Sequence, residues 1–257
     1  MTNVKTLLFA CLVFGQSVAS AAPDAQEILA ASDAIRNPGH AFTVMVTLTE
    51  FHAGKQVDTS TLMTYSRAQE QGDQFASLIR FVLPARDTGK LMLKSGNDLW
   101  FYDPSTKASV RLSPQQRLLG QASNGDVVTV NLAKDYRATL LAEESIQDGE
   151  RRTRKAYKLG LTATAADVSY SVIEMWVDVE NSRPLKARFF AESGRLLKTA
   201  YYRRFQPQLG ADRPTETVII DGLDPQSVTV MRFTDFASRT MPMTWFHRDY
   251  LPRFQPE

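Results

Sequence analysis

The sequence predicts a mainly β protein built on one strongly curled, up-and-down antiparallel sheet of about eleven strands. Three observations predict this fold class. Apolar and polar residues alternate with a period of two through most of the chain after residue 41, as they do in half-buried strands. Turn-forming residues separate these segments, so most connections have the length of a hairpin. Long helical patterns do not alternate with the strands, which argues against a parallel, doubly wound sheet.

The N-terminus has the pattern of a cleavable signal peptide. A short polar start carrying Lys5 precedes an apolar run from Leu7 to Phe14, and small residues follow up to Ala21. The apolar run is too short to span a bilayer. We therefore expect residues 1–21 to direct secretion and the mature protein to reside in the periplasm. The alternative is a buried N-terminal helix.

The rest of the chain, residues 22–257, is expected to form a single domain, because its composition shows no break. The only cysteine, Cys11, lies within the predicted signal peptide, so the mature protein has to be stabilised by its core and not by disulfides. Cys11 precedes much of the apolar run, and so it does not have the position of a lipoprotein cysteine. A chain of this length can bury a sufficient core.

The charges are balanced, with 30 Lys and Arg against 28 Asp and Glu. The one basic run, residues 151–155, follows a turn signal and is expected to be a solvated hairpin tip. No nucleic-acid-binding motif accompanies this run, so we expect no nucleic-acid partner.

One helix precedes the strands. Asp24, with Glu27 three residues later, has the arrangement of a capping box. Ile28, Leu29 and Ile35 fall at helical spacing. Asn-Pro-Gly at residues 37–39 ends the pattern, and the sequence therefore predicts an amphipathic helix from about Ala25 to Arg36.

The first strand shows the period of two most clearly, because four apolar residues (Phe42, Val44, Val46 and Leu48) alternate with polar or less apolar ones. Turn residues at 52–56 then lead into the second strand. Strands are expected at residues 57–67, 75–82, 91–94, 99–102 and 107–112, and again at 138–144, 156–164, 169–179, 185–191, 196–205, 217–221 and 228–236. Residues 242–250 are compatible with a short terminal helix.

Residues 113–135 interrupt the strand pattern. Ser113-Pro114 is typical of a helix start, residues 121–126 are small and polar, and the residues after them have no clean period. The stretch is long for a hairpin connection, and connections of this length are often functional lids. We therefore expect a lid between Ser113 and Asp135.

The sequence offers little for catalysis or metal binding. His40, His52 and His247 share no metal-ligand spacing, and each is expected to be a surface or packing residue. Phosphate-loop, dinucleotide and nucleophile-elbow motifs are absent. We therefore predict no enzyme activity, no metal site and no cofactor.

Carboxylates are the weaker alternative. Asp103, Asp126, Asp135 and Asp221 fall at expected turns or strand ends, where turn chemistry alone accounts for such residues. The spacing of these carboxylates is compatible with a hydrolase that uses a carboxylate pair, although no specific motif supports this function.

Residues 96–104, GNDLWFYDP, resemble the aromatic strand and Asp-Pro turn of the LolA-like carriers, the outer-membrane lipoprotein-sorting family. The signal peptide, the early helix and the strand meander are similar as well. Further likeness, at Ser113–Gln116, Gly120–Asp126, Arg195–Lys198 and Met231–Leu251, is to the branch of this family associated with RND exporters.

The resemblance implies an unclosed half β-barrel whose concave face is covered by a few helices. It also implies a monomeric periplasmic carrier without enzyme activity. Such a carrier holds a lipid or a lipoprotein acyl chain in an apolar cavity and shuttles it toward the outer membrane, beside an RND- or MMPL-type inner-membrane exporter. The alternative function is an interaction module of an exporter or envelope complex, with a solid core and no lipid cargo.

Within this reading, two groups of residues are candidates for the site. We expect the cavity to be lined by Phe42, Val44, Val46, Leu48, Leu91, Leu93, Leu99 and Phe101. We expect the lid to include Ile28, Leu29, Leu118 and Leu119. The same alternation is found in any sheet core, so a plain core is the alternative interpretation of the first group.

Overall fold

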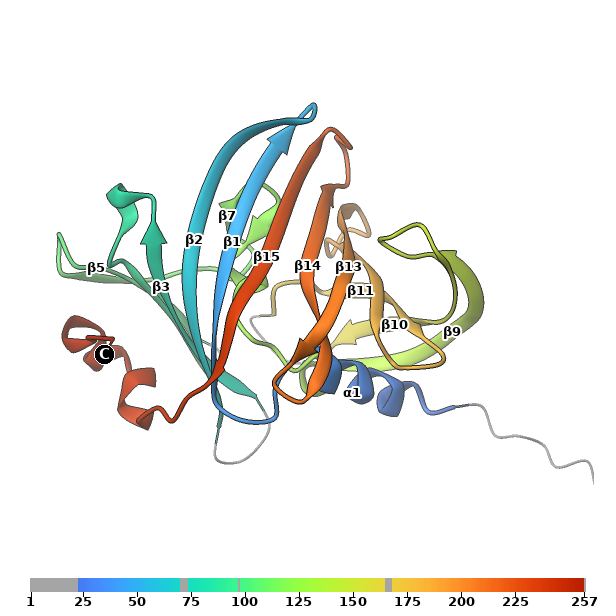
Figure 1. Cartoon of the computed structure of the whole chain (residues 1–257), viewed down its shortest axis with the longest axis horizontal. Coiled ribbons are helices and arrows are strands. Elements are labelled where there is room, and N and C mark those ends of the chain that lie inside the picture. The colour runs from blue at the N-terminus through green and yellow to red at the C-terminus, as the bar shows by residue number, and fades with distance from the viewer. Residues whose placement is uncertain (1–22, 70–73, 97, 165–167, 257) are drawn as a thin grey trace, which may run out of the picture.

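A computed structural model describes residues 23–69, 74–96, 98–164 and 168–256 (Figure 1). The predicted signal peptide, residues 1–21, lies outside the described residues. The fold is mainly β, as predicted, with one large antiparallel sheet and a few short helices. The main sheet has thirteen strands, as many as the separate ranges expected from the sequence, although the expected total was given as about eleven.

The main sheet consists of two meanders. The first contains β1 (Phe42–His52), β2 (Lys55–Ala68), β3 (Phe75–Leu83), β4 (Leu91–Ser95), β5 (Asp98–Asp103) and β6 (Ala108–Arg111). The second contains β9 (Tyr136–Gln147), β10 (Thr153–Ala163), β11 (Val172–Asp178), β12 (Pro184–Phe190), β13 (Leu196–Gln208), β14 (Ala211–Asp221) and β15 (Ser227–Ser238).

The first and last strands meet in the middle of the sheet. β1 pairs with β15, so the strand order is β6-β5-β4-β3-β2-β1-β15-β14-β13-β12-β11-β10-β9. The edge strands β6 and β9 do not pair with each other, and the curled sheet is therefore an unclosed barrel (Figure 1). The chain runs outward from the centre to β6, crosses to the opposite edge at β9, and returns strand by strand to the centre.

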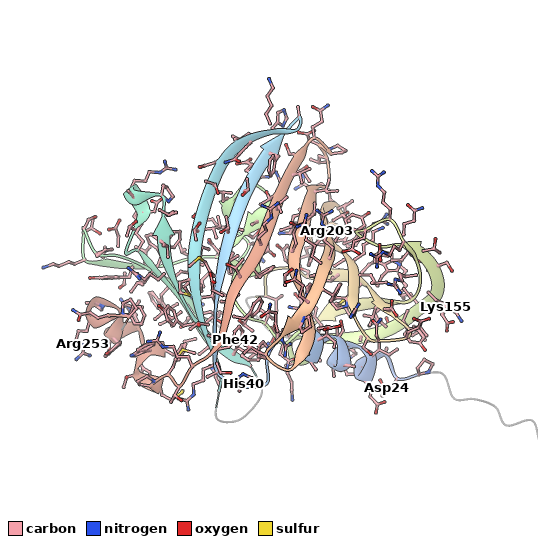
Figure 2. The ribbon with its side chains drawn as sticks, viewed as in Figure 1. Asp24, His40, Phe42, Lys155, Arg203 and Arg253 are labelled. Carbon is pink, nitrogen blue, oxygen red and sulfur yellow. The ribbon has the colours of Figure 1, made fainter. Side chains whose placement is uncertain are left out.

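The helix α1 (Ala25–Arg36) has the bounds that its capping signals predicted. Asp24, at its start in Figure 2, accepts a hydrogen bond from the Gln26 backbone N–H at 2.7 Å. At the other end, the Asn37 N–H still bonds to the Asp33 carbonyl, and Pro38 then stops the helix. α1 packs against β9, β11, β12 and β14, with Leu29 fully buried.

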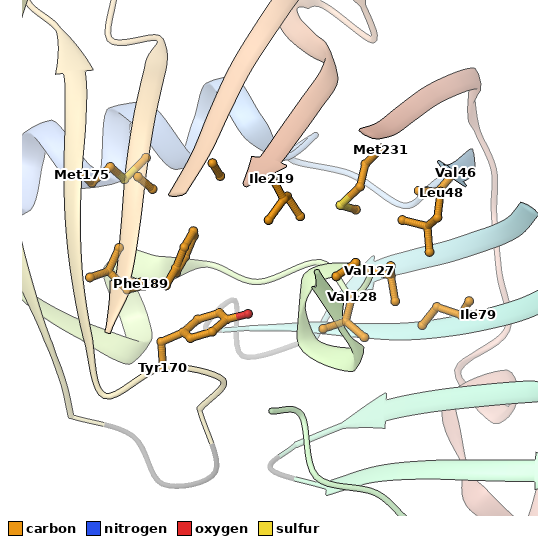
Figure 3. Packing of buried hydrophobic residues seen from close by; sticks show 14 of the residues in the cluster. Val46, Leu48, Ile79, Val127, Val128, Tyr170, Met175, Phe189, Ile219 and Met231 are labelled. Atoms are coloured by element: carbon orange, nitrogen blue, oxygen red, sulfur yellow. The ribbon is translucent and has the colours of Figure 1, made fainter. Parts of the chain in front are cut away.

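The concave face of the sheet carries the larger apolar cluster. This concave cluster includes Leu29, Val46, Leu62, Ile79, Met92, Leu159, Met175, Phe189, Ile219 and Met231 (Figure 3). On β1, alternate residues contribute to it, namely Phe42, Val44, Val46 and Leu48, which is the expected consequence of the alternating direction of side chains in a strand.

The opposite, convex face of the first meander carries a second cluster. It comprises Tyr65, Ala76, Leu78, Leu91, Leu93, Tyr102, Met241, Trp245, Phe246 and Leu251. The last four residues belong to the C-terminal segment, which forms the 3₁₀ helices η3 (Met243–Phe246) and η4 (Arg248–Arg253) where a short helix was expected. Arg67 fixes this segment by donating to the Met241 carbonyl at 2.6 Å. The C-terminal segment thus covers an apolar face that would otherwise meet water.

Candidate functional site

The connection between the two meanders crosses the concave face. Because β6 and β9 are opposite edges, residues 112–135 have to pass over the sheet, and we call them the crossing segment. It contains the paired strands β7 (Arg117–Leu119) and β8 (Ala122–Ser123), the 3₁₀ turn η2 (Asn124–Asp126) and the short helix α2 (Leu132–Asp135). The crossing segment occupies the stretch in which the sequence predicted a lid.

A cavity of about 210 Å³ lies between the crossing segment and the sheet. Val46 on β1 and Met231 on β15 belong to its floor, and Val127 and Val128 of the crossing segment belong to its roof (Figure 3). Phe189 on β12 adds an aromatic wall. Most of the lining is therefore aliphatic or aromatic.

Hydrogen bonds hold the roof to the first meander. The Thr129 N–H donates to the Ser77 hydroxyl at 3.1 Å, and the Thr129 hydroxyl lies 2.5 Å from that of Ser66. The Gln74 side chain donates to the Asn131 carbonyl at 2.8 Å and accepts from the Asn131 N–H at 3.0 Å. At Thr129 and Asn131 the backbone of the crossing segment therefore bonds to side chains of the first meander, and not to the backbone of a neighbouring strand.

The helix α1 holds the same segment from the other side. The Asp33 carboxylate accepts from the Ala133 N–H at 2.8 Å and pairs with Arg36 at 2.8 Å. The Asn37 amide donates to the Val130 carbonyl at 2.8 Å. Burial raises the pKa of Asp33 to about 6, although the positive charge of Arg36 opposes this shift.

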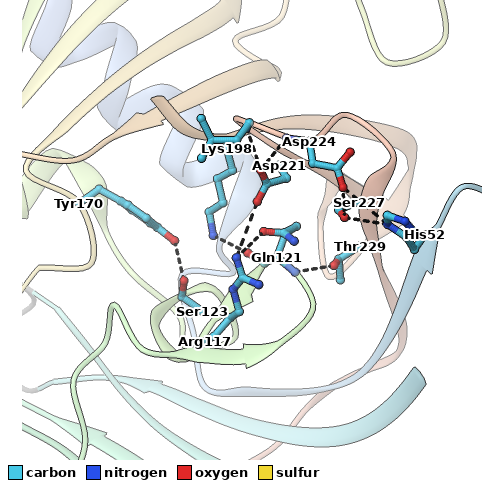
Figure 4. Close-up of polar contacts among 11 residues, drawn as sticks. His52, Arg117, Gln121, Ser123, Tyr170, Lys198, Asp221, Asp224, Ser227 and Thr229 are labelled. Atoms are coloured by element: carbon cyan, nitrogen blue, oxygen red, sulfur yellow. Dashed lines mark hydrogen bonds and ion pairs between the residues drawn. The ribbon is translucent and has the colours of Figure 1, made fainter. Parts of the chain in front are cut away.

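A buried ion pair ties η2 to the second meander. Lys198 on β13 pairs with Asp126 of the crossing segment, and the side chain of Lys198 is only 4% exposed. Lys198 also donates to the Gln121 carbonyl at 3.1 Å (Figure 4). The rings of Tyr170 and Phe189 lie 4.8 and 5.5 Å from its ammonium nitrogen. Charge, hydrogen bond and ring faces together compensate for the removal of this lysine from water.

Tyr170 completes this contact. Its hydroxyl donates to Asp126 Oδ1 at 2.9 Å. It also lies 3.3 Å from the Ser123 hydroxyl (Figure 4). Burial holds the pKa of Tyr170 well above its ordinary value, and the nearby Asp126 carboxylate acts in the same direction. The phenol therefore stays protonated and remains a donor.

Two glycines allow the crossing segment to approach the sheet closely. Gly120 has a φ of +54°, and a Cβ at this position would collide with Thr229 and crowd Glu50. At Gly125, a Cβ would collide with the Ser169 hydroxyl. Beside Gly120, the Gln121 N–H donates to the Thr229 hydroxyl at 2.7 Å (Figure 4). Glycine is required at residue 120 both for the backbone conformation and for space.

The structure divides the residues expected to line the cavity. Those that face it are Phe42, Val44, Val46 and Leu99. Leu48 and Phe101 belong to or pack against the concave cluster but do not line the cavity.

Leu91 and Leu93 lie on the convex face, so their expected place on the cavity wall is corrected. In β4 it is Met92 that faces the concave cluster. The first three residues of this short strand are all apolar and buried, and the period of two therefore gave no signal for which face points inward.

The residues expected in the lid belong to the covering elements but not to the cavity wall. Leu29 is part of the concave cluster, and Ile28, Leu118 and Leu119 pack against it. The roof itself is made by residues 125–136, including Val127, Val128 and Val130. Sequence reasoning missed the roles of these residues, of Tyr170 and of Lys198. The inward position of Lys198 could have been predicted from the sequence. It lies two residues before Ala200 and four before Tyr202 on β13, and alternate residues of a strand point to the same face.

The histidines lie on the surface of the described chain, and all three are exposed. His52 contacts the Ser227 hydroxyl at 3.1 Å and Asp224 at 3.6 Å at a hairpin tip (Figure 4). Residues 23–69, 74–96, 98–164 and 168–256 contain no group of three or more His, Cys, Asp or Glu side chains placed to hold a metal ion. Over the same ranges, none of the helices combines the length and apolarity needed to cross a membrane.

An unclosed antiparallel barrel with a cavity on its concave face, covered by a crossing segment, defines the class of LolA-like proteins. The sequence is 37% identical to a LolA superfamily protein from Nitrosomonas europaea. That match covers 89% of this chain and 100% of the other, with a TM-score of 0.79. The chain belongs to the LolA superfamily.

Other comparisons agree on the fold. A DUF1329 family protein from Desulfovibrio piger is 21% identical with a TM-score of 0.75, covering 89% of this chain and 100% of the other. A domain named for outer membrane lipoprotein sorting, from Vibrio parahaemolyticus, is 20% identical with a TM-score of 0.74, covering 89% and 98%. A family model described as an uncharacterized protein matches residues 73–253. The curated proteins gave no match.

Proposed function

We propose that this protein is a periplasmic carrier that binds the acyl chain of a lipid or lipoprotein in the concave cavity and shuttles it toward the outer membrane. The observation that carries the proposal is a mostly apolar cavity between the sheet and a segment held to it by side-chain contacts. Each acyl methylene that leaves water for such a wall contributes about 0.8 kcal/mol, so one long chain supplies ample affinity.

Loading requires an opening, and the crossing segment supports a way to make one. Few of its contacts to the main sheet are of the strand-ladder type, and the described bonds are made by individual side chains such as Gln74, Asp33 and Lys198. Such contacts can break one by one, whereas a strand ladder is lost as a unit. In this proposal the part of the roof that belongs to the crossing segment, residues 125–135, moves away from the floor to admit the chain, and no covalent step occurs.

The partner in this proposal is an inner-membrane exporter of the RND or MMPL type, on which the carrier is loaded. The support is the resemblance of the segments around Ser113 and Gly120 to the exporter-associated branch. The alternative function, an interaction module without cargo, leads to the expectation of a solid core. The cavity therefore favours the carrier over the module.

The experiment is lipid analysis of protein purified from its own periplasm. Native mass spectrometry should show an adduct that organic solvent removes, and a fluorescent fatty acid should bind to the delipidated protein. A Val128→Trp variant fills the roof side of the cavity and should lose most of this binding.

The exposed Leu223→Trp change gives the matched control and should bind like the wild type. Protein that carries no adduct and binds no fatty acid would contradict the carrier function. In that case, recovery of an envelope protein complex by cross-linking would support the interaction module.

A further inference from the structure

Three hydroxyl groups on the cavity wall lack a hydrogen-bond partner among the described residues. They belong to Thr64 on β2, Tyr202 on β13 and Thr217 on β14, and all three residues line the cavity. Thr64 is 2% exposed, its hydroxyl is buried, and Thr217 is 8% exposed. In the rest of the described chain, buried side-chain atoms without a partner are few.

The strand register places these hydroxyls on two sides of an apolar floor. Tyr202 is the direct cross-strand partner of Thr217, so their side chains leave the sheet side by side on the concave face. Thr64 is opposite Val44 on β1, and β1 and β15 separate it from β14. Burial raises the pKa of Tyr202, which keeps its hydroxyl protonated as a donor.

Buried hydroxyls without partners cost free energy, and folded proteins pair nearly all of their buried polar groups. A purely hydrocarbon ligand would leave these three groups unpaired after driving water from the cavity. A ligand with carbonyl oxygens would accept hydrogen bonds from them. Hydroxyl donors set in an aliphatic and aromatic wall therefore match a molecule that has both a long chain and a carbonyl group close to it.

We propose that Tyr202, Thr217 and Thr64 make the cavity selective for cargo whose chains are attached through ester or amide carbonyls, and that these hydroxyls donate to the carbonyl oxygens. The inference rests on the proposed carrier function and names the chemical class of its cargo. Sterols and plain hydrocarbons satisfy the apolar wall but not the hydroxyls.

The test compares two ligands that differ in one carbonyl group. 1-Palmitoylglycerol has an ester, and 1-O-hexadecylglycerol has an ether at the same position. Full-length mature protein should bind the ester about tenfold more tightly, as expected for one or two hydrogen bonds to a buried acceptor. The Tyr202→Phe/Thr217→Val/Thr64→Val variant, which lacks all three hydroxyls, should bind the two ligands equally, with its affinity for the ether unchanged. Retained ether binding shows that the variant has folded.

The matched control is Tyr201→Phe. Tyr201 neighbours Tyr202 on β13 but faces the opposite side of the sheet, where its ring lies near Lys186. This variant removes the same hydroxyl chemistry and should keep the preference for the ester. Thr64→Val tests the other side of the floor, and it should reduce ester binding without changing ether binding.

The outcomes separate this inference from the carrier function. Binding of neither ligand by the wild type overturns both proposals. Equal binding of both ligands by the wild type, or an ester preference that the triple variant keeps, leaves the carrier and overturns the role of the hydroxyls. Mass spectrometry of cargo extracted from the native protein then identifies the source: a glycerolipid or an acylated peptide supports the inference, and a sterol or hydrocarbon overturns it.

Discussion

Lys198 points inward from β13, where its neighbours on the same face are Ala200 and Tyr202. A lysine in this position is costly unless it is paired, and Asp126 pairs with it from 72 residues away. Tyr170 and Ser123 bind the carboxylate as well, so the two charges belong to one polar network inside an apolar cavity. This network fixes where the crossing segment lies.

Removal of one charge should therefore loosen the cover of the cavity. Lys198→Met leaves the Asp126 carboxylate unpaired, and we expect it to lower the free energy of unfolding by about 3–5 kcal/mol. Lys198→Met/Asp126→Asn should recover part of this loss. Urea unfolding measures the loss, and hydrogen exchange of residues 123–130 should rise in the single variant.

Lys155→Met is the control for that experiment. Lys155 also forms an ion pair, with Glu143, but its side chain is 65% exposed (Figure 2). Exposed pairs contribute roughly 0–1 kcal/mol. A loss as large at Lys155 as at Lys198 would show that burial of the ion pair is not the cause.

A second residue-scale prediction concerns Asp33, whose pKa burial raises from 3.8 to about 6. The folded protein holds this proton more tightly than the unfolded chain does. The contribution of Asp33 to stability is therefore present at low pH and is lost as the pH rises from about 4 to 6, by up to about 1.4 kcal/mol for each pH unit. Asp33→Asn should remove this component, which urea unfolding at pH 4.5 and 7 measures.

Asp103→Asn is the comparison for Asp33. Hydrogen bonds from Ser105 lower the pKa of Asp103, so its contribution is lost only as the pH falls below 3.8. Between pH 4.5 and 7 this variant should follow the wild type. An Asp33→Asn variant that also followed the wild type would contradict the raised pKa.

At the scale of elements, the sequence predicted some parts well and others poorly, for physical reasons. The bounds of α1 follow from local signals, namely the cap at Asp24 and the stop at Pro38. The interruption at residues 113–135 was visible as a loss of the strand period. Its internal arrangement was not, because contacts such as Lys198–Asp126 and Asn131–Gln74 join residues far apart in the chain. The sequence also did not show which residues of β4 face the concave side, since Leu91, Met92 and Leu93 are all apolar and buried.

The crossing segment depends on Gly120, and a matched pair of variants tests why. Gly54 also has a positive φ, +77°, but a Cβ there would meet nothing within 4 Å. We expect Gly54→Ala to cost about 1–2 kcal/mol through backbone strain alone. Gly120→Ala should cost a further 1–3 kcal/mol, approximately, from the collision with Thr229 and Glu50. Equal losses in thermal unfolding would argue against close packing at Gly120.

The C-terminal segment is the other element that covers the sheet. Leu251 is 1% exposed within the convex cluster, whereas Leu223 is 75% exposed at a turn. Leu251→Ala should lower the free energy of unfolding by about 2–5 kcal/mol, and Leu223→Ala should change it by less than about 0.5 kcal/mol. Urea titration distinguishes the two. Similar values would mean that the C-terminal segment does not stabilise the fold.

For the whole molecule, the two faces of the sheet have different roles. The convex face of the first meander is covered by the C-terminal segment, with Trp245, Phe246 and Leu251 buried. The concave face is covered by the crossing segment and α1, and it keeps a cavity. One face of the sheet is therefore covered by apolar packing, while the other combines such packing with a cavity. This division follows from topology, because a chain whose halves end on opposite edges has to send its middle across one face.

The pairing of β1 with β15 also sets an order on folding. Each meander contains mainly local contacts, and its hairpins can form as soon as their own strands exist. The central ladder joins residues from opposite ends of the sequence, for example Leu48 with Met231, so it closes the largest loop in the protein. Until β15 is available for pairing, β1 and β14 are two long unpaired edges. The chain is therefore exposed to aggregation until almost its last residues are available, and a chaperone that shields strand edges would be of most use in that interval.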